Sequence, residues 1–270
     1  VLTAASVTQT ANAMNATTEA ALDAAIAGEH RSDENRARDQ YRKPKETLTF
    51  FGFRSDMDVL EVWPGGGWYT QILAPSLKDN GTLYAAHFGP NGEFGFQRRV
   101  YGKFVAMLGE TPDLYRDVIV TKLALPYSLR MAPPESVDMV LTFRSVHNWV
   151  GGLFGKGAYA QAVFQAMYDS LRPGGTLGVV DHRWPDPATE DPISKNGYIS
   201  KERTIALAEA VGFRLVAESD ILANPKDTHD HPRGVWTLPP GFRLGEEDRD
   251  KYIAIGESDR FLLRFEKPAE

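Results

Sequence analysis

The sequence of 270 residues contains no cysteine. Disulfide bonds, thiol nucleophiles and cysteine metal ligands are therefore excluded. No run reaches the roughly 18 consecutive apolar residues that a membrane-spanning helix needs. The formal net charge of -6 argues against nonspecific binding to nucleic acid, which requires a basic surface. What remains is ordinary globular composition, with 42% hydrophobic and 24% charged residues, enough for one large domain or two small ones.

The sequence begins at Val1 and continues to Ala27 with many alanines and threonines, without a charged start or an apolar core segment. This pattern fits a chain whose signal peptide has been removed, so we expect a periplasmic or secreted protein. A cytoplasmic protein trimmed at this point would look the same. Residues 1 to about 15 predict a flexible lead-in, and residues 17–27 predict a helix that ends at Gly28.

Residues 30–47 are densely charged and helical in pattern, with an interruption at Pro44 and a further helical turn to Phe51. One interpretation is a solvated helical face. The other is a lid that covers a ligand cleft and supplies Tyr41 or Arg42. We therefore divide the chain into an N-terminal helical extension, residues 1–50, and a main domain, residues 51–270.

From Asp58 onward, strand and helix patterns alternate, which is typical of a parallel sheet covered on both faces. Strands are expected at residues 59–63, 82–87, 118–122, 137–143, 176–181, 213–219 and 260–267. Helices are expected at residues 68–77, 95–108, 158–171 and 201–211. Residues 223–257, rich in proline and glycine, predict a long loop, and such loops are often functional or disordered.

The most informative segment is a glycine-rich turn, Gly65-Gly66-Gly67, directly after the apolar strand that contains Glu61. An α/β protein builds a nucleotide or cofactor pocket from a buried strand that ends near an acidic residue, followed by a glycine-rich turn and a helix. Glycines let the backbone approach a ligand, and a helix start offers free N–H groups. Taken alone, the turn is weak evidence, because many nucleotide-binding folds have one.

A second element, Leu171-Arg172-Pro173-Gly174-Gly175 before an apolar strand, makes the combination specific. The sequence from about Lys45 to Pro268 resembles the class I S-adenosylmethionine-dependent methyltransferases. The resemblance implies a Rossmann-like, mostly parallel seven-stranded sheet with helices on both faces, S-adenosylmethionine as cofactor and a small-molecule methyl acceptor. The version Trp-Pro-Gly-Gly-Gly-Trp-Tyr-Thr is similar to a subgroup of bacterial predicted methyltransferases that often carry signal peptides.

By the family's pattern, Glu61 holds the ammonium group of the cofactor. The expected cofactor-binding residues are Glu61, Trp63, Gly65, Gly66, Gly67, Tyr69, Thr70, His87, Phe143 and Arg144. Two positions depart from the family: Trp63 stands at the usual first glycine, and His87 stands where an acid holds both ribose hydroxyls. The acid near the adenine after the third strand is also missing, and these departures together predict weak or altered cofactor binding.

The candidate catalytic residues are His147, His182, Asp181 and Tyr41. His147 follows the expected fourth strand and the other two end the fifth, so they should meet where α/β sheets bind ligands. A histidine oriented by Asp181 could act as general base toward a hydroxyl or amine. The alternative for His147 is a structural histidine bonded to a backbone carbonyl.

No metal site is expected, although His229 and His231 in the long loop could share an ion with a third ligand. The leading interpretation is a methyltransferase. The alternative is a binding protein, without catalysis or with altered activity, that uses a degenerate S-adenosylmethionine cleft. A nicotinamide-dependent oxidoreductase is disfavoured, since its acid should follow the glycines by about 20 residues.

Overall fold

The computed structural model describes residues 14–151 and 159–269. A seven-stranded sheet of order β3-β2-β1-β4-β5-β7-β6 forms its centre. Strand β7 runs antiparallel to both neighbours, and the other pairs are parallel. The strands are β1 Asp58–Val62, β2 Thr82–His87, β3 Ile119–Lys122, β4 Val137–Phe143, β5 Leu171–His182, β6 Arg214–Ser219 and β7 Arg260–Glu266.

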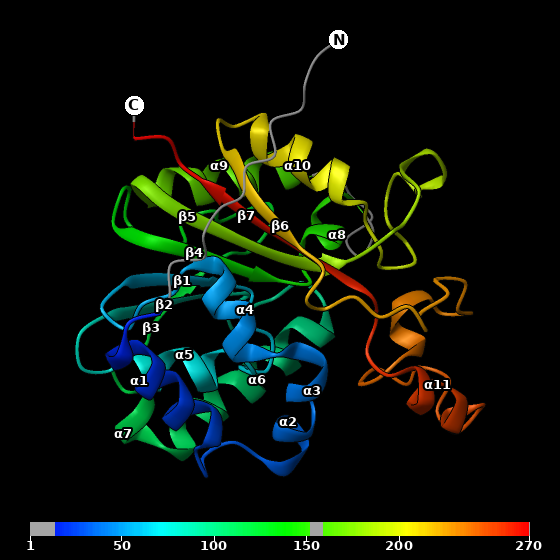
Figure 1. The fold of residues 1–270 in the computed structure, drawn as a ribbon, viewed down its shortest axis with the longest axis horizontal. Helices are drawn as coiled ribbons and strands as arrows, with labels where there is room; N and C mark the ends of the chain where they lie inside the picture. Colours follow the sequence, from blue (N-terminus) through cyan, green and yellow to red (C-terminus); the bar gives the residue numbers. More distant parts are fainter. Residues whose placement is uncertain (1–13, 152–158, 270) are drawn as a thin grey trace.

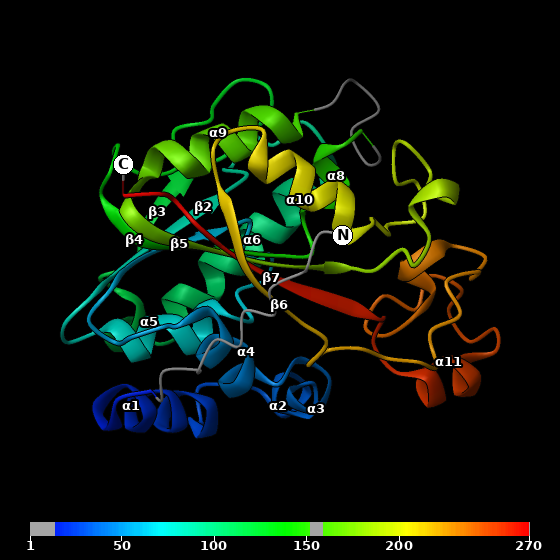
Figure 2. The same cartoon turned by 45° about the horizontal axis from the view of Figure 1, so that its top comes forward.

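Helices cover both faces of this sheet (Figure 1, Figure 2). Helices α9 Ala160–Ser170 and α10 Lys201–Glu209 lie on one face, and α1 Ala16–Ala27, α4 Pro44–Phe51 and α5 Thr70–Leu77 lie on the other. The remaining helices are α2 Asp33–Ala37, α3 Asp39–Arg42, α6 Gly95–Glu110, α7 Pro112–Tyr115, α8 Val146–Trp149 and α11 Arg249–Ile255, with short 3₁₀ turns η1 Pro187–Thr189 and η2 Gly234–Thr237.

The N-terminal helices share a core with the sheet. Leu22 of α1 and Phe51 of α4 pack in the same buried cluster as Ile72 of α5 and Val59 of β1. The Asn15 side chain caps the start of helix α1, and Gly52, which follows the last residue of α4, has a left-handed φ of 78°. These helices are therefore anchored over one face of the sheet. No helix of the described residues is long and apolar enough to span a bilayer.

The register of the parallel strands aligns their carboxyl ends at one edge. Val62 of β1 pairs with Ala86 of β2 and Thr142 of β4, and Phe143 pairs with Val180 of β5. Residues that follow these strands are consequently brought together, although they are far apart in the sequence.

The expected fold is confirmed, with some shifted boundaries. Strand β5 begins at Leu171, five residues before the expected start, so the Pro-Gly-Gly segment lies inside the strand rather than in a joint. Helix α5 begins at Thr70 because the two preceding residues belong to the glycine turn. The expected flexible lead-in lies mostly outside the described residues, as does the expected start of the helix at residue 158. The long loop contains η2 and α11, so it is partly structured.

Candidate active site

A small cleft lies at the carboxyl edge of the sheet, with a volume of about 140 Å³. Its walls come from α2 and α3, from the turn after β1, and from the end of β4. The lining residues are Asn35, Arg38, Arg42, Glu61, Trp63, Pro64, Gly65, Gly66, Trp68, Tyr69, Phe143 and Arg144. A larger hollow of about 1110 Å³ lies at the opposite edge, at the starts of β1, β4 and β5, away from the residues expected to bind the cofactor.

Glu61 forms the acidic part of the cleft and is 1% exposed. The Thr70 hydroxyl donates a hydrogen bond of 2.5 Å to Oε2 of Glu61. Burial raises the pKa of Glu61 to about 8, and the Thr70 bond offsets this only in part. No arginine or lysine among the described residues pairs with Glu61. The carboxyl group can therefore accept a cationic ligand, as the family pattern predicts.

The three glycines of the turn have different surroundings. A side chain at Gly65 or Gly66 would meet no heavy atom within 4 Å, and both residues line the cleft. Gly67, with a φ of 87°, faces Met107 and Phe104 of α6, so a larger residue there would clash with the helix. The backbone can approach a ligand at the first two glycines, whereas the third is needed for packing.

His87 ends β2 as expected, but its side chain does not face a ribose position. Its Nε2 lies 2.9 Å from the Gly65 carbonyl, and its Nδ1 accepts a hydrogen bond of 2.8 Å from the Phe88 amide. Nδ1 is therefore the acceptor and Nε2–H the donor. Burial lowers the pKa of His87 to about 4, so the ring is neutral at pH 7. The ring anchors the glycine turn, and both nitrogens are occupied, which corrects the ribose-binding prediction.

Trp63 has a left-handed φ of 51°, a conformation that favours glycine. Its indole N–H donates a 3.0 Å hydrogen bond to the carbonyl of Leu123, just after β3. The ring packs against Phe88, with centroids 4.7 Å apart, and against Trp149 at 5.7 Å. Only 7% of the residue is exposed. The indole thus extends from the end of β1, past the end of β2, to the loop after β3.

The position of the Trp63 indole decides whether S-adenosylmethionine fits this cleft. The resemblance places the ribose at the end of β2 and the adenine near the loop after β3, where the Trp63 indole lies. The nucleoside half therefore does not fit while Trp63 is in this position. The amino-acid half fits, because Glu61 and the open backbone at Gly65 and Gly66 border the cleft.

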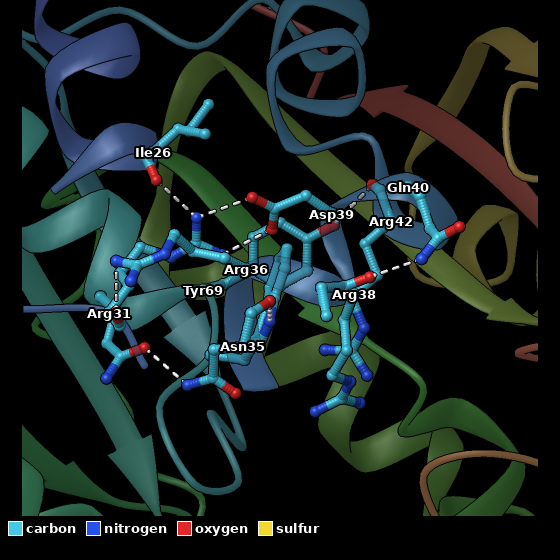
Figure 3. A network of polar contacts seen from close by, with 12 residues as sticks. Ile26, Arg31, Asn35, Arg36, Arg38, Asp39, Gln40, Arg42 and Tyr69 are labelled. Carbon is cyan, nitrogen blue, oxygen red and sulfur yellow. Dashed lines mark hydrogen bonds and ion pairs between the residues drawn. The ribbon is translucent and has the colours of Figure 1, made fainter. Parts of the chain in front are cut away.

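Arg38 and Arg42 from the N-terminal helical segment form another part of the cleft wall, and Figure 3 shows them among the polar residues of this segment. Arg38 Nε donates to Glu257 at 2.7 Å, and Arg42 Nε donates to the same carboxylate at 3.0 Å. Arg260 also pairs with Glu257. These arginines, together with Arg144, hold the pKa of Glu257 well below its usual range despite burial. Burial lowers the pKa of Arg42, with a further contribution from Arg144.

Arg144 follows β4 with a left-handed φ of 61°. Its amide donates to the Val180 carbonyl, but its guanidinium has no hydrogen-bond or ion-pair partner among the described residues. Burial lowers its pKa to about 10. The preceding Phe143 stacks on Tyr69, with centroids 3.5 Å apart. The Arg144 side chain therefore borders the cleft as a cation that makes no ion pair or hydrogen bond with the described residues, although the nearby Glu257 favours its charge.

His147 and His182 meet behind this wall, with ring centroids 5.2 Å apart. Asp181 Oδ1 accepts from His147 Nδ1 at 2.8 Å, and its Oδ2 accepts from the His147 amide at 3.2 Å. Because Nδ1 donates its hydrogen to Asp181, Nε2 of His147 keeps its lone pair and can accept a hydrogen bond. His182 Nδ1 contacts Ser258 Oγ at 2.5 Å. Asp181 orients an imidazole as expected, but neither histidine lines the 140 Å³ cleft.

The cluster of His147, Asp181 and His182 also has the spacing of potential metal ligands. His147, Asp181 and His182 bring ligand atoms within 4.8 Å of one another. Burial lowers the pKa of His182 well below its usual value, and nearby positive charges, including Arg260 and Arg144, lower it further.

His229 and His231 are held apart from this cluster. His231 Nε2 lies 2.9 Å from Asp227, and His229 Nε2 lies 3.6 Å from Asp259. Each histidine has its own carboxylate, and the described residues supply no shared ligand set for them.

Tyr41 lies beside Gly256 and does not line the cleft, so the structure places Arg42 rather than Tyr41 over the glycine turn. The sequence interpretation missed Asn35, Arg38 and Glu257. Arg38 and Glu257 are 219 residues apart, and no local pattern connects them.

No family model matches the sequence, and no curated protein matches it. Solved structures with the same fold are similar over most of the chain. A SAM-dependent methyltransferase from Aquifex aeolicus has 14% identity and a TM-score of 0.55, covering 86% of this chain and 93% of its own. Geranyl diphosphate methyltransferase in complex with SAM has 12% identity and a TM-score of 0.56, covering 91% and 94%. The [4+2]-cyclase SpnF has 15% identity and a TM-score of 0.57, covering 96% and 98%.

At these identities the likeness shows the fold. The chain has the class I, Rossmann-like fold of S-adenosylmethionine-dependent methyltransferases, with additional N-terminal helices. The cyclase among its structural neighbours shows that the fold by itself does not specify one reaction.

Proposed function

We propose that this protein is an S-adenosylmethionine-dependent methyltransferase that acts on a small molecule. The observation that carries the proposal is the buried Glu61 beside the open backbone of Gly65 and Gly66, with no cationic partner among the described residues. The cofactor would supply an electrophilic methyl group on sulfur. Glu61 would hold its ammonium, and the backbone at the two glycines would lie along its amino-acid end.

Methyl transfer to a hydroxyl or amine also requires removal of a proton. His147 suits this role because Asp181 fixes its Nδ1 and leaves Nε2 as acceptor. Because His147 follows Arg144 by only three residues, the methyl acceptor would lie beyond the Arg144 side of the cleft.

Calorimetry with S-adenosylmethionine and S-adenosylhomocysteine tests the proposal. Trp63→Gly removes the indole from the nucleoside path and suits the left-handed φ, so affinity should increase about tenfold or more. Gly66→Val places a side chain in open cleft space without a left-handed φ, so it should abolish binding while leaving the unfolding temperature nearly unchanged. If neither the wild type nor Trp63→Gly binds either compound, the proposal is wrong.

A second candidate is a binding protein without transfer activity. It is favoured by the Trp63 indole, which packs across the nucleoside path with a satisfied N–H. Binding by Trp63→Gly but not by the wild type would support this second candidate.

A further inference from the structure

With the Trp63 indole in place, the remaining cleft is a small polar chamber. Its volume of about 140 Å³ corresponds to roughly four or five water molecules at ~30 Å³ each. Pockets for drug-sized ligands usually measure about 300–1,000 Å³. The chamber suits a molecule much smaller than a nucleoside cofactor.

The arginine side of the chamber carries excess positive charge. Arg38, Arg42 and Arg260 share a single carboxylate, Glu257, and Arg144 adds a cation without a partner among the described residues. Arg42 is 2% exposed and lines the chamber, and its buried Nη2 has no hydrogen-bond partner in the part of the chain that the structure describes. A buried donor without an acceptor is costly, so an anion that accepts from Arg42 and Arg144 would remove that cost.

The Glu61 side of the chamber lacks a positive charge, just as the arginine side lacks a negative one. The Glu61 carboxyl receives one hydrogen bond, from Thr70, and no cation among the described residues faces it. An ammonium group there would stabilise the ionised carboxylate in a site where burial opposes the charge. An anion alone would satisfy the arginines but leave Glu61 without a cation.

We propose that this chamber binds a free α-amino acid with a small side chain, its carboxylate at Arg42 and Arg144 and its ammonium at Glu61. Such a ligand needs no movement of Trp63, whereas S-adenosylmethionine does. The amino acid would therefore compete with S-adenosylmethionine for the chamber. This competition rests on the proposed function, whereas binding of the amino acid itself does not.

The test is calorimetry of the wild type with glycine, alanine, methionine, acetate and inorganic phosphate, without S-adenosylmethionine. At least one amino acid should bind more tightly than acetate or phosphate. Arg144→Gln should weaken that binding by about tenfold or more, as loss of a charge-assisted hydrogen bond does. The control Arg214→Gln, an exposed residue of β6 paired with Glu266, should change nothing. Glu61→Gln should reduce the preference for the amino acid over acetate.

The inference is overturned if none of the amino acids binds, if phosphate binds as tightly as the best amino acid, or if Arg144→Gln binds like the wild type. Its failure is separable from that of the methyltransferase proposal. Cofactor binding by Trp63→Gly without amino-acid binding by the wild type rejects only this inference. Amino-acid binding by the wild type without cofactor binding by Trp63→Gly rejects only the proposed transfer function.

Discussion

Two glutamates near the cleft are buried to the same degree but have opposite surroundings. Glu61 is 1% exposed and Glu257 is 2% exposed. Burial raises the pKa of Glu61 to about 8, whereas Arg260, Arg42 and Arg38 hold that of Glu257 well below its usual range. Burial alone therefore does not set the charge of an acid, and the presence of a cation decides it.

The presence of cations at Glu257 and their absence at Glu61 distinguish a structural region around Glu257 from a proposed binding region around Glu61. Glu257 is neutralised by the protein itself and ties the N-terminal helices to the segment before β7. Glu61 has no cation beside it among the described residues, and its raised pKa keeps it protonated at pH 7 unless a ligand brings a positive charge. The following predictions test this contrast, from the largest expected effect to the smallest.

Glu257→Gln should lower the free energy of unfolding by about 3–5 kcal/mol, because it leaves buried arginines without their shared carboxylate. Urea unfolding at pH 7 measures this. The control Glu266→Gln breaks the exposed pair with Arg214 and should cost less than about 1 kcal/mol. Equal losses in the two variants would contradict the assigned role of Glu257.

Glu61→Gln should stabilise the ligand-free protein at neutral pH. The pKa of Glu61 is about 8 in the folded state against 4.5 in the unfolded chain, so wild-type stability falls as pH rises from 4.5 to 8. At pH 7 the cost is about 3 kcal/mol, from 2.5 pH units at ~1.36 kcal/mol each. Unfolding curves at pH 4.5 and 7 should show this slope in the wild type and in Glu247→Gln, but not in Glu61→Gln.

His87 should have the opposite pH dependence. Its pKa is lowered from 6.5 to about 4, so its contribution is fully present above pH 6.5 and decreases as pH falls toward 4. At pH 5 the loss is about 2 kcal/mol. His87→Gln keeps a donor for the Gly65 carbonyl but does not titrate. A wild type that loses no more stability than His87→Gln between pH 7 and 5 would reject this assignment.

Arg144→Gln should not lower the free energy of unfolding at pH 7 and should raise it, because burial and the neighbouring arginines that lower the pKa of Arg144 oppose its charge in the folded state. Thermal unfolding without ligand measures it. A large destabilisation would mean that Arg144 has a structural role rather than a ligand-binding one.

The fold could be predicted because its signals are local. Apolar runs such as residues 137–143 and the glycine turn after Glu61 are readable within a short window, and they match β4 and the end of β1. The parallel topology also implied that His147 and Asp181 would meet, and they do.

The details of the cleft could not be predicted in the same way. The path of the Trp63 indole depends on Phe88 and Leu123, which lie on other strands or loops. The hydrogen bond from His87 to Gly65 depends on how the turn folds back over β2. Such contacts are set by tertiary packing, for which a single sequence carries no periodic signal.

The left-handed backbone at Trp63 has an evolutionary consequence. Tryptophan is encoded by UGG and glycine by GGG, so one base change exchanges the two residues. Because the φ of 51° already suits glycine, the exchange would require no rearrangement of the main chain. A single point mutation can therefore exchange tryptophan and glycine at this position without straining the main chain.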